Sequence, residues 1–177
     1  FIRNICMVAK SPVDAQYGNS KLTILLGYLG LIPFLVPLWQ MTVAVGGGQG
    51  VDGAAIFGLY APYVFITYSA IILSFLGGIL WSKGRFISRK RSSNIAVIFS
   101  NLMALSAWAS LIIINFSSLL TMFAVALLLA GFGSLLLAER SLEIDSEDRI
   151  YWRMRLVLTM IVIVAHGLVL AFLIREF

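Results

Sequence analysis

The sequence predicts an all-α integral membrane protein, a bundle of about five transmembrane helices, and three observations support this fold class. Of the 177 residues, 60% are hydrophobic and only 12% are charged, whereas soluble domains are nearer half apolar and a quarter charged. The mean hydropathy is +0.98. Several long apolar segments alternate with short segments that hold almost all the charge, which is typical of a multi-span membrane protein.

Each predicted helix is a segment of roughly 20 residues, the length that crosses a bilayer. None of them contains Asp, Glu, Lys or Arg, and they are Leu22–Val45, Ala61–Ser82, Ile95–Ile114, Ser118–Ala138 and Leu156–Ile174. The third is diluted by Ser and Asn, but a Ser hydroxyl can bond a carbonyl of its own helix, so we expect it to span as well. Residues 22–177 are therefore predicted to form one transmembrane domain. Residues 1–21 precede it as a tail, either flexible or partly an interfacial helix.

Basic residues divide unequally between the two sides of this arrangement. With five spans, 12 of the 13 Lys and Arg residues fall on one side and only Arg175 falls on the other. The positive-inside rule then places the N-terminus inside and the C-terminus outside. We expect the bacterial inner (cytoplasmic) membrane, with the mitochondrial inner membrane as the alternative. Because the chain begins with Phe1, we expect it to be processed or part of a longer product.

The loop after the second segment is the most basic part of the chain. It holds Lys83, Arg85, Arg89, Lys90 and Arg91. Basic side chains next to a membrane helix attract anionic lipid headgroups, so membrane lipids are the predicted partners of this loop. The cluster is short and doubles as a topology signal, so we do not expect nucleic acid to bind.

Small residues recur at every fourth position in three predicted helices, and residues four apart share a helix face. The second segment carries Ala70, Ser74, Gly78 and Ser82 with Gly77 beside them, the third carries Ala96, Ser100 and Ala104, and the fourth carries Ala126, Ala130, Ser134 and Ala138. Lipid tails give helices no hydrophobic reason to associate, so close packing depends on small residues. We predict helix contacts through these faces. The alternative is that such residues are simply common in membrane helices.

The first segment contains Pro33 and Pro37. Each proline removes an amide donor and crowds the carbonyl four residues earlier. A kink or an unwound stretch near Leu29–Pro33 is therefore predicted. Broken helices carry binding sites in transporters, but prolines also occur in membrane helices without any ligand.

His166 is the candidate for chemistry inside the bilayer. We expect a neutral, structural imidazole that hydrogen-bonds to a neighbouring helix, because a buried polar group needs a partner. A haem, metal or quinone ligand is the alternative. One His cannot build a His-based metal cluster, and Cys6, the single Cys, cannot form an intrachain disulfide. The sequence thus predicts no catalytic residue, no metal site, no cofactor and no enzymatic activity.

Two loops contain residues that resemble ligand-binding patterns. Val45–Asp52 is rich in Gly but lacks the Lys-Ser/Thr of a phosphate loop, so we interpret it as a flexible turn. Glu139–Asp148 carries five acids, but their spacing fits no EF-hand pattern, so we interpret it as a solvated loop.

Several stretches resemble a family of small multi-span proteins of proteobacteria and mitochondria, known as a domain of unknown function. They are Leu26–Phe34 (LGYLGLIPF), Tyr68–Trp81 (YSAIILSFLGGILW), Leu127–Leu142 and Tyr151–Thr159. The SFLGG segment is the most specific of them. Family members often have His or Arg before the Trp that follows the glycine pair, whereas this chain has Leu80. The resemblance implies an inner-membrane protein of about five spans and supplies no activity.

The leading functional hypothesis is a non-catalytic accessory or assembly-type subunit of a larger, energy-converting inner-membrane complex. It would act by packing against other integral membrane subunits and by contacting lipid. A small transporter or channel that uses the Pro33/Pro37 kink is the first alternative. A haem- or quinone-binding subunit that uses His166 is the second.

Overall fold

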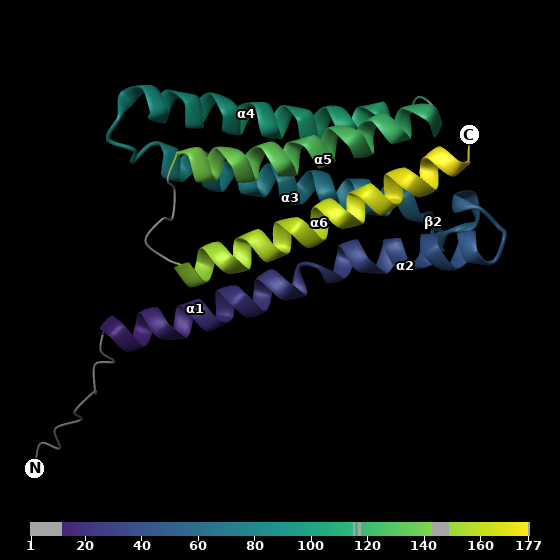
Figure 1. The fold of residues 1–177 in the computed structure, drawn as a ribbon, viewed down its shortest axis with the longest axis horizontal. Helices are drawn as coiled ribbons and strands as arrows, with labels where there is room; N and C mark the ends of the chain where they lie inside the picture. Colours follow the sequence, from purple (N-terminus) through teal and green to yellow (C-terminus); the bar gives the residue numbers. More distant parts are fainter. Residues whose placement is uncertain (1–11, 115, 117, 143–148, 177) are drawn as a thin grey trace, which may run out of the picture.

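The computed structural model describes residues 12–114, 116, 118–142 and 149–176, which are almost entirely helical (Figure 1). In chain order, the elements are α1 (Pro12–Leu29), α2 (Ile32–Gly46), the 3₁₀ turn η1 (Val51–Gly53), β1 (Ala55–Ile56), β2 (Leu59–Tyr60), α3 (Ala61–Gly84), α4 (Lys90–Ile113), α5 (Ser118–Ser141) and α6 (Arg149–Arg175).

The predicted five-span fold is confirmed, because the described residues contain five helical segments long and apolar enough to cross a membrane. The first comprises the end of α1 together with α2, and α3 to α6 supply the others. The helices are longer than predicted at several ends. α1 begins at Pro12, inside the predicted tail, and α5 continues to Ser141. The predicted interfacial helix near the N-terminus concerns residues 1–11, which lie outside the described part.

The helices lie side by side along the long axis of the molecule (Figure 1). α3 is central and packs against α2, α4 and α5, and its contact with α4 is the most extensive in the bundle. α6 packs against α5 on one side and against α1 and α2 on the other. The fully buried side chains include Phe65, Leu73 and Leu80 of α3 and Leu128 and Leu135 of α5. The core therefore runs along α3 and α5.

The first span is broken between α1 and α2, which confirms the predicted interruption. Pro33 lies in the first turn of α2 and cannot donate a hydrogen bond to Leu29. Phe34 N–H donates to the Leu31 carbonyl at 3.0 Å, and not to the Gly30 carbonyl four residues earlier, as it would in a continuous α-helix. The Tyr68 hydroxyl of α3 donates to that carbonyl at 2.9 Å. A side chain of another helix thus satisfies the backbone at the break.

The Gly-rich connection between α2 and α3 is an organised structure. β1 and β2 form a hairpin whose two turn residues, Phe57 and Gly58, both have positive φ, as a type I′ turn requires. The Val51 amide donates to Oε1 of Glu176 at 2.6 Å. The Tyr60 hydroxyl donates to Oδ1 of Asp52 at 3.1 Å. Burial, and then the Asp52 charge, raise the pKa of Tyr60. The predicted flexible turn is therefore held by specific hydrogen bonds.

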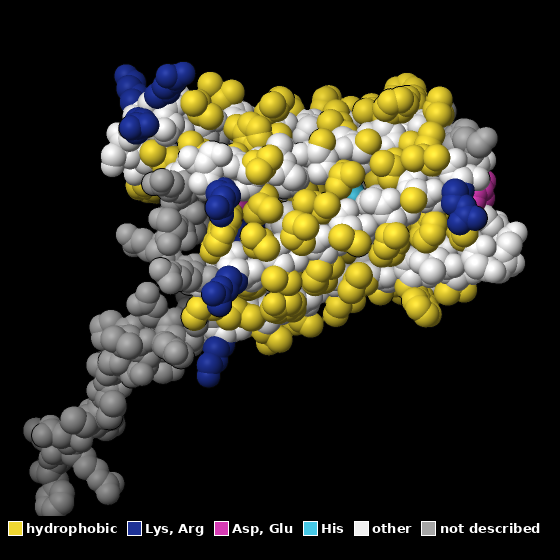
Figure 2. Space-filling model, viewed as in Figure 1, with side chains coloured by type: hydrophobic (Ala, Val, Ile, Leu, Met, Phe, Trp, Pro, Cys, Tyr) yellow, Lys and Arg dark blue, Asp and Glu magenta, His cyan; other side chains and the backbone are white. Residues whose placement is uncertain are grey.

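Large apolar side chains cover the outside of the bundle (Figure 2). Trp39 is 67% exposed, Ile98 is 70% exposed and Leu137 is 66% exposed. In water, such a surface would drive aggregation, whereas lipid tails solvate it. Lys and Arg side chains gather at the end where α4 and α6 begin, and few charges lie elsewhere on this face (Figure 2). The surface is that of a membrane protein.

Candidate functional site

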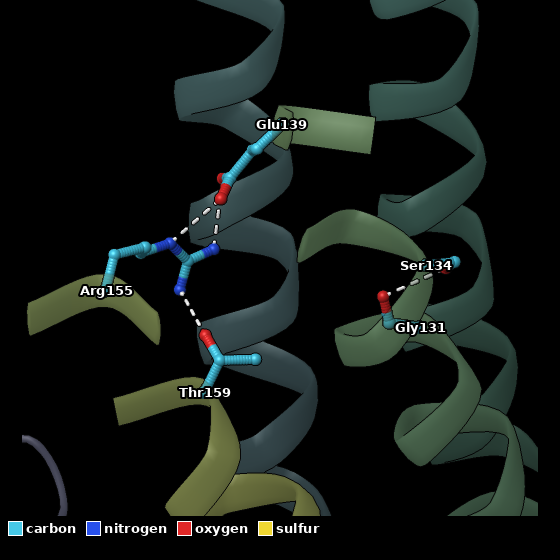
Figure 3. A network of polar contacts seen from close by, with 5 residues as sticks. All are labelled: Gly131, Ser134, Glu139, Arg155 and Thr159. Carbon is cyan, nitrogen blue, oxygen red and sulfur yellow. Dashed lines mark hydrogen bonds and ion pairs between the residues drawn. The ribbon is translucent and has the colours of Figure 1, made fainter. Parts of the chain in front are cut away.

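A buried ion pair joins the end of α5 to the beginning of α6. Arg155 binds Glu139 in a bidentate manner, through Nε to Oε2 at 3.1 Å and Nη2 to Oε1 at 3.0 Å. Nη1 of Arg155 donates to the Thr159 hydroxyl at 3.2 Å. Figure 3 shows the three side chains converging from the two helices. Both charged side chains are only 9% exposed, so each charge depends on the other for its compensation.

The sequence analysis did not identify this pair. The predicted spans end at Ala138 and begin again at Leu156, which puts Glu139 in the connecting loop and Arg155 at the beginning of the last helix, and no sequence pattern pairs them. In the structure the helices extend past these points, and the antiparallel α5–α6 hairpin brings together residues that are 16 positions apart. The acidic residues 143–148 of the same connection lie outside the described part of the chain.

His166 lies deep in the bundle and is fully buried. Its ring packs among three phenylalanines, with centroid distances of 4.7 Å to Phe65, 5.3 Å to Phe132 and 6.1 Å to Phe34. Nδ1 lies 2.8 Å from the Val162 carbonyl of the same helix. Because a carbonyl can only accept, Nδ1 carries the proton and donates it to this bond.

The hydrogen-bond partner of His166 differs from the one that the sequence predicts. We expected His166 to bond across helices, but its bond runs to its own backbone, four residues earlier. Nε2 has no hydrogen-bond partner among the described residues. With the proton on Nδ1, this nitrogen carries a lone pair that can accept a hydrogen bond. The described residues also contain no cluster of His, Cys, Asp and Glu that could hold a metal ion.

A groove opens on the side of the bundle between α1, α2, α3 and α6, with a cavity volume of about 380 Å³, which is within the size range of small-molecule sites. Its walls are mainly apolar and include Leu26 of α1, Leu76 and Ile79 of α3, and Leu158 of α6. α1 makes its main contact with α6 alone, so it stands away from α3 and leaves this space.

The two ends of the groove differ in chemistry. Tyr151 and Arg155, in the first two turns of α6, line one end, and Thr159 lies one turn further along the groove. Phe34 and Phe132 line the opposite, inner end, and both are also in ring contact with His166. The groove therefore leads from the buried ion pair to the aromatic cluster around the histidine.

The structure shifts the predicted small-residue face of α3 by one position. A Cβ added at Gly77 would lie 3.1 Å from the Ser100 carbonyl oxygen of α4, and one at Gly84 would lie 2.5 Å from the Cβ of Ala96. Around Gly78, by contrast, a Cβ would meet nothing within 4 Å. The close approach of α3 to α4 therefore uses Gly77 and Gly84.

The other members of the predicted α3 face divide between inside and outside. Ala70 is buried, Ser74 is half-buried and Ser82 is exposed. Ala70 therefore lies in the core, whereas Gly78 and Ser82 lie on the outside of the bundle. This corrects the predicted stripe. Its residues do lie four apart, but at Gly78 and Ser82 they face the outside of the bundle and not a neighbouring helix.

The predicted face of α5 makes a helix contact in part, because the Ser134 hydroxyl lies 3.7 Å from Sδ of Met103 on α4. Ala130 is exposed, whereas Ala126 and Ser134 are half-buried. Gly131 is buried, and a Cβ there would lie 2.6 Å from Cδ2 of Leu73. Ser134 donates to the Gly131 carbonyl at 3.0 Å (Figure 3). Gly131, which was not part of the predicted face, packs against Leu73 of α3.

The basic residues predicted to meet lipid headgroups lie at the α3–α4 connection. The Arg85 guanidinium lies over the Trp81 ring, 4.8 Å from its centroid, and the Lys83 ammonium lies 5.0 Å from the centroid of Tyr151. Arg89, Lys90 and Arg91 are exposed. Their contact with lipid stays a prediction.

Comparison with known proteins confirms the resemblance drawn from the sequence. Residues 19–171 match the model of a family described as "Protein of unknown function (DUF3429)". Neither the curated proteins nor the solved structures gave a match to the chain.

Proposed function

This chain belongs to the DUF3429 family, whose function is unknown, and from that premise we propose that it is a non-catalytic accessory subunit of a larger membrane complex that holds a membrane lipid. The observation that carries the proposal is the groove between α1, α2, α3 and α6. Its long apolar walls and single polar end suit an amphiphile, and it opens on a surface that contacts lipid tails.

The outward face of α3 supports the subunit part of the proposal. Gly78 and Ser82 are exposed and lie four residues apart on this face. Small residues at this spacing let two membrane helices approach closely. Within this chain the position of Gly78 is open, so it is the place where a helix of another subunit packs in the proposed complex.

The proposal also includes the orientation of the chain and the membrane that contains it. The division of basic residues favours the N-terminus on the cytoplasmic or matrix side, in a bacterial inner membrane or, alternatively, a mitochondrial inner membrane. Single cysteines at Gly48 and Ser88 test the orientation. We expect a membrane-impermeant thiol reagent to label Gly48→Cys from outside and to leave Ser88→Cys unlabelled, and the reverse pattern would overturn it.

Two other functions have specific support. The α1–α2 break suits a transporter, since interrupted helices form substrate sites there. The unpartnered Nε2 of His166 suits a haem or quinone ligand. Neither accounts for the groove and the outward small-residue face together, so the accessory role is the stronger proposal.

Purification from native membranes in a gentle detergent, followed by mass spectrometry of partners and bound molecules, tests these functions together. We expect other integral membrane proteins and a lipid to co-purify. Gly78→Leu should release the partners without lowering the stability of the isolated chain. A partner-free protein that transports a solute in liposomes would favour the transporter, and a visible absorbance band would favour the haem subunit.

A further inference from the structure

The length of the groove matches one leaflet of a bilayer. Along α6 it extends from Tyr151 to Val162, which is about 16 Å at 1.5 Å per residue. The hydrocarbon core of a bilayer is roughly 30 Å thick, so one leaflet contributes about half of that. An acyl chain that enters at the polar end and lies along the groove therefore reaches its inner, aromatic end at about the depth where the leaflet ends.

The end of the groove where α6 begins provides hydrogen-bond donors for a ligand oxygen. Arg155 lines the groove, and its three bonds to Glu139 and Thr159 use three of its five N–H groups. Among the described residues, one N–H on Nη1 and one on Nη2 make no further bond and are available to an oxygen acceptor in the proposed site. Because Glu139 balances the Arg155 charge, this contact is mainly a hydrogen bond.

The positive charge beside the groove comes from other residues. The Lys83 ammonium is held over Tyr151, which lines the groove, and Lys21 is exposed two residues before Thr23, another lining residue. Figure 2 shows basic side chains gathered at this end of the molecule. The Lys83 and Lys21 side chains are positively charged and would attract an anionic group at this end.

We propose that the groove is a site for an anionic diacyl phospholipid, with one acyl chain between α1, α3 and α6, an ester or phosphate oxygen on Arg155, and the phosphate near Lys83. The proposal rests on the proposed lipid-holding function and names the class of lipid. Zwitterionic phospholipid and free fatty acid are the competing occupants.

The protein reconstituted into nanodiscs of phosphatidylglycerol or of phosphatidylcholine with the same acyl chains tests this site. Native mass spectrometry then counts the lipid molecules retained. We expect stronger retention of phosphatidylglycerol, weakened about fivefold by Lys83→Gln, the equivalent of roughly 1 kcal/mol for one basic side chain. Lys90→Gln is the matched control, because it removes the same charge at the beginning of α4, which does not line the groove.

A second pair of variants tests whether the chain lies in the groove. Ile79→Trp fills the groove and should abolish retention of either phospholipid, whereas Ile98→Trp, on the exposed face of α4, should leave retention unchanged. Equal retention of the two phospholipids would overturn the anionic assignment while the lipid-holding function stands. Preferential retention of free fatty acid would overturn the diacyl assignment. Retention that Ile79→Trp does not change would overturn both the site and the proposed function.

Discussion

Two adjacent glycines of α3 should respond in opposite directions to the same substitution. Gly77 faces α4, where an added Cβ would lie 3.1 Å from the Ser100 carbonyl oxygen and 3.4 Å from Cβ of Met103. Gly78 faces open space. Because the two positions share one helix, Gly→Ala changes the intrinsic helix propensity equally at both, by up to about 1 kcal/mol in favour of Ala. The difference between the variants therefore measures the packing contact alone.

At Gly77 the new methyl group meets backbone, which cannot rotate away. Overpacking of this kind costs about 1–3 kcal/mol, so we expect the free energy of unfolding of Gly77→Ala to be lower than that of Gly78→Ala by that amount. Gly78→Ala itself should equal or exceed the parent. Reversible unfolding in mixed micelles of increasing SDS content, followed by circular dichroism, measures these differences.

Gly84→Ala provides an internal check on the reasoning. Its Cβ would lie 2.5 Å from the Cβ of Ala96, a closer approach than at Gly77, so we expect its free energy of unfolding to be lowered at least as much. Equal free energies for the Gly77 and Gly78 variants would refute the assignment of the α3–α4 contact. A loss at Gly78 alone would restore the face predicted from the sequence.

Three further predictions concern polar groups inside the bundle. Glu139→Leu and Arg155→Leu should each lower the free energy of unfolding by about 3 kcal/mol, since each leaves the other charge buried without its partner. The double variant should lower the free energy of unfolding by less than either single variant, and additive decreases would argue against the ion pair. Tyr68→Phe should cost about 1 kcal/mol, because it removes the bond to the Gly30 carbonyl across the break; an unchanged value would show that this bond contributes nothing. His166→Leu should stay within about 1 kcal/mol of the parent or exceed it, since it removes an unpartnered buried nitrogen; a larger loss would indicate a donor bound at Nε2.

The fold could be predicted because the signals that determine it are local. Long uncharged segments identified the spans, and the missing amide of Pro33 identified the break between α1 and α2. The direction of a helix face is not local information. Gly77 and Gly78 differ by only one step of about 100° around α3, and which of them faces α4 depends on how the helices assemble.

The candidate site was less accessible to sequence reasoning because it depends on contacts between helices. The spans were predicted as segments without any charged residue. They therefore end one position before Glu139 and begin one position after Arg155, and this criterion excludes both members of the pair. The burial of His166 was foreseen, but its bond to Val162 was not, since the sequence does not show whether an i–4 carbonyl or a neighbouring helix supplies the partner. The groove exists because α1 packs against α6 and lies away from α3, and no pattern in the sequence predicts this arrangement.

The hydrogen bond between Val51 and Glu176 has a consequence for biosynthesis. It joins positions 125 residues apart, and Glu176 lies so close to Gly50 that a Cβ there would approach Oε1 to 2.7 Å. A ribosome has translated the α2–α3 connection long before it reaches this carboxylate. The α2–α3 connection is therefore made before α3, α4, α5 and α6, and its hydrogen bond to Glu176 forms only after α6 has been synthesised. The hydrogen-bonded structure of the first loop is therefore complete only after the last helix has been made.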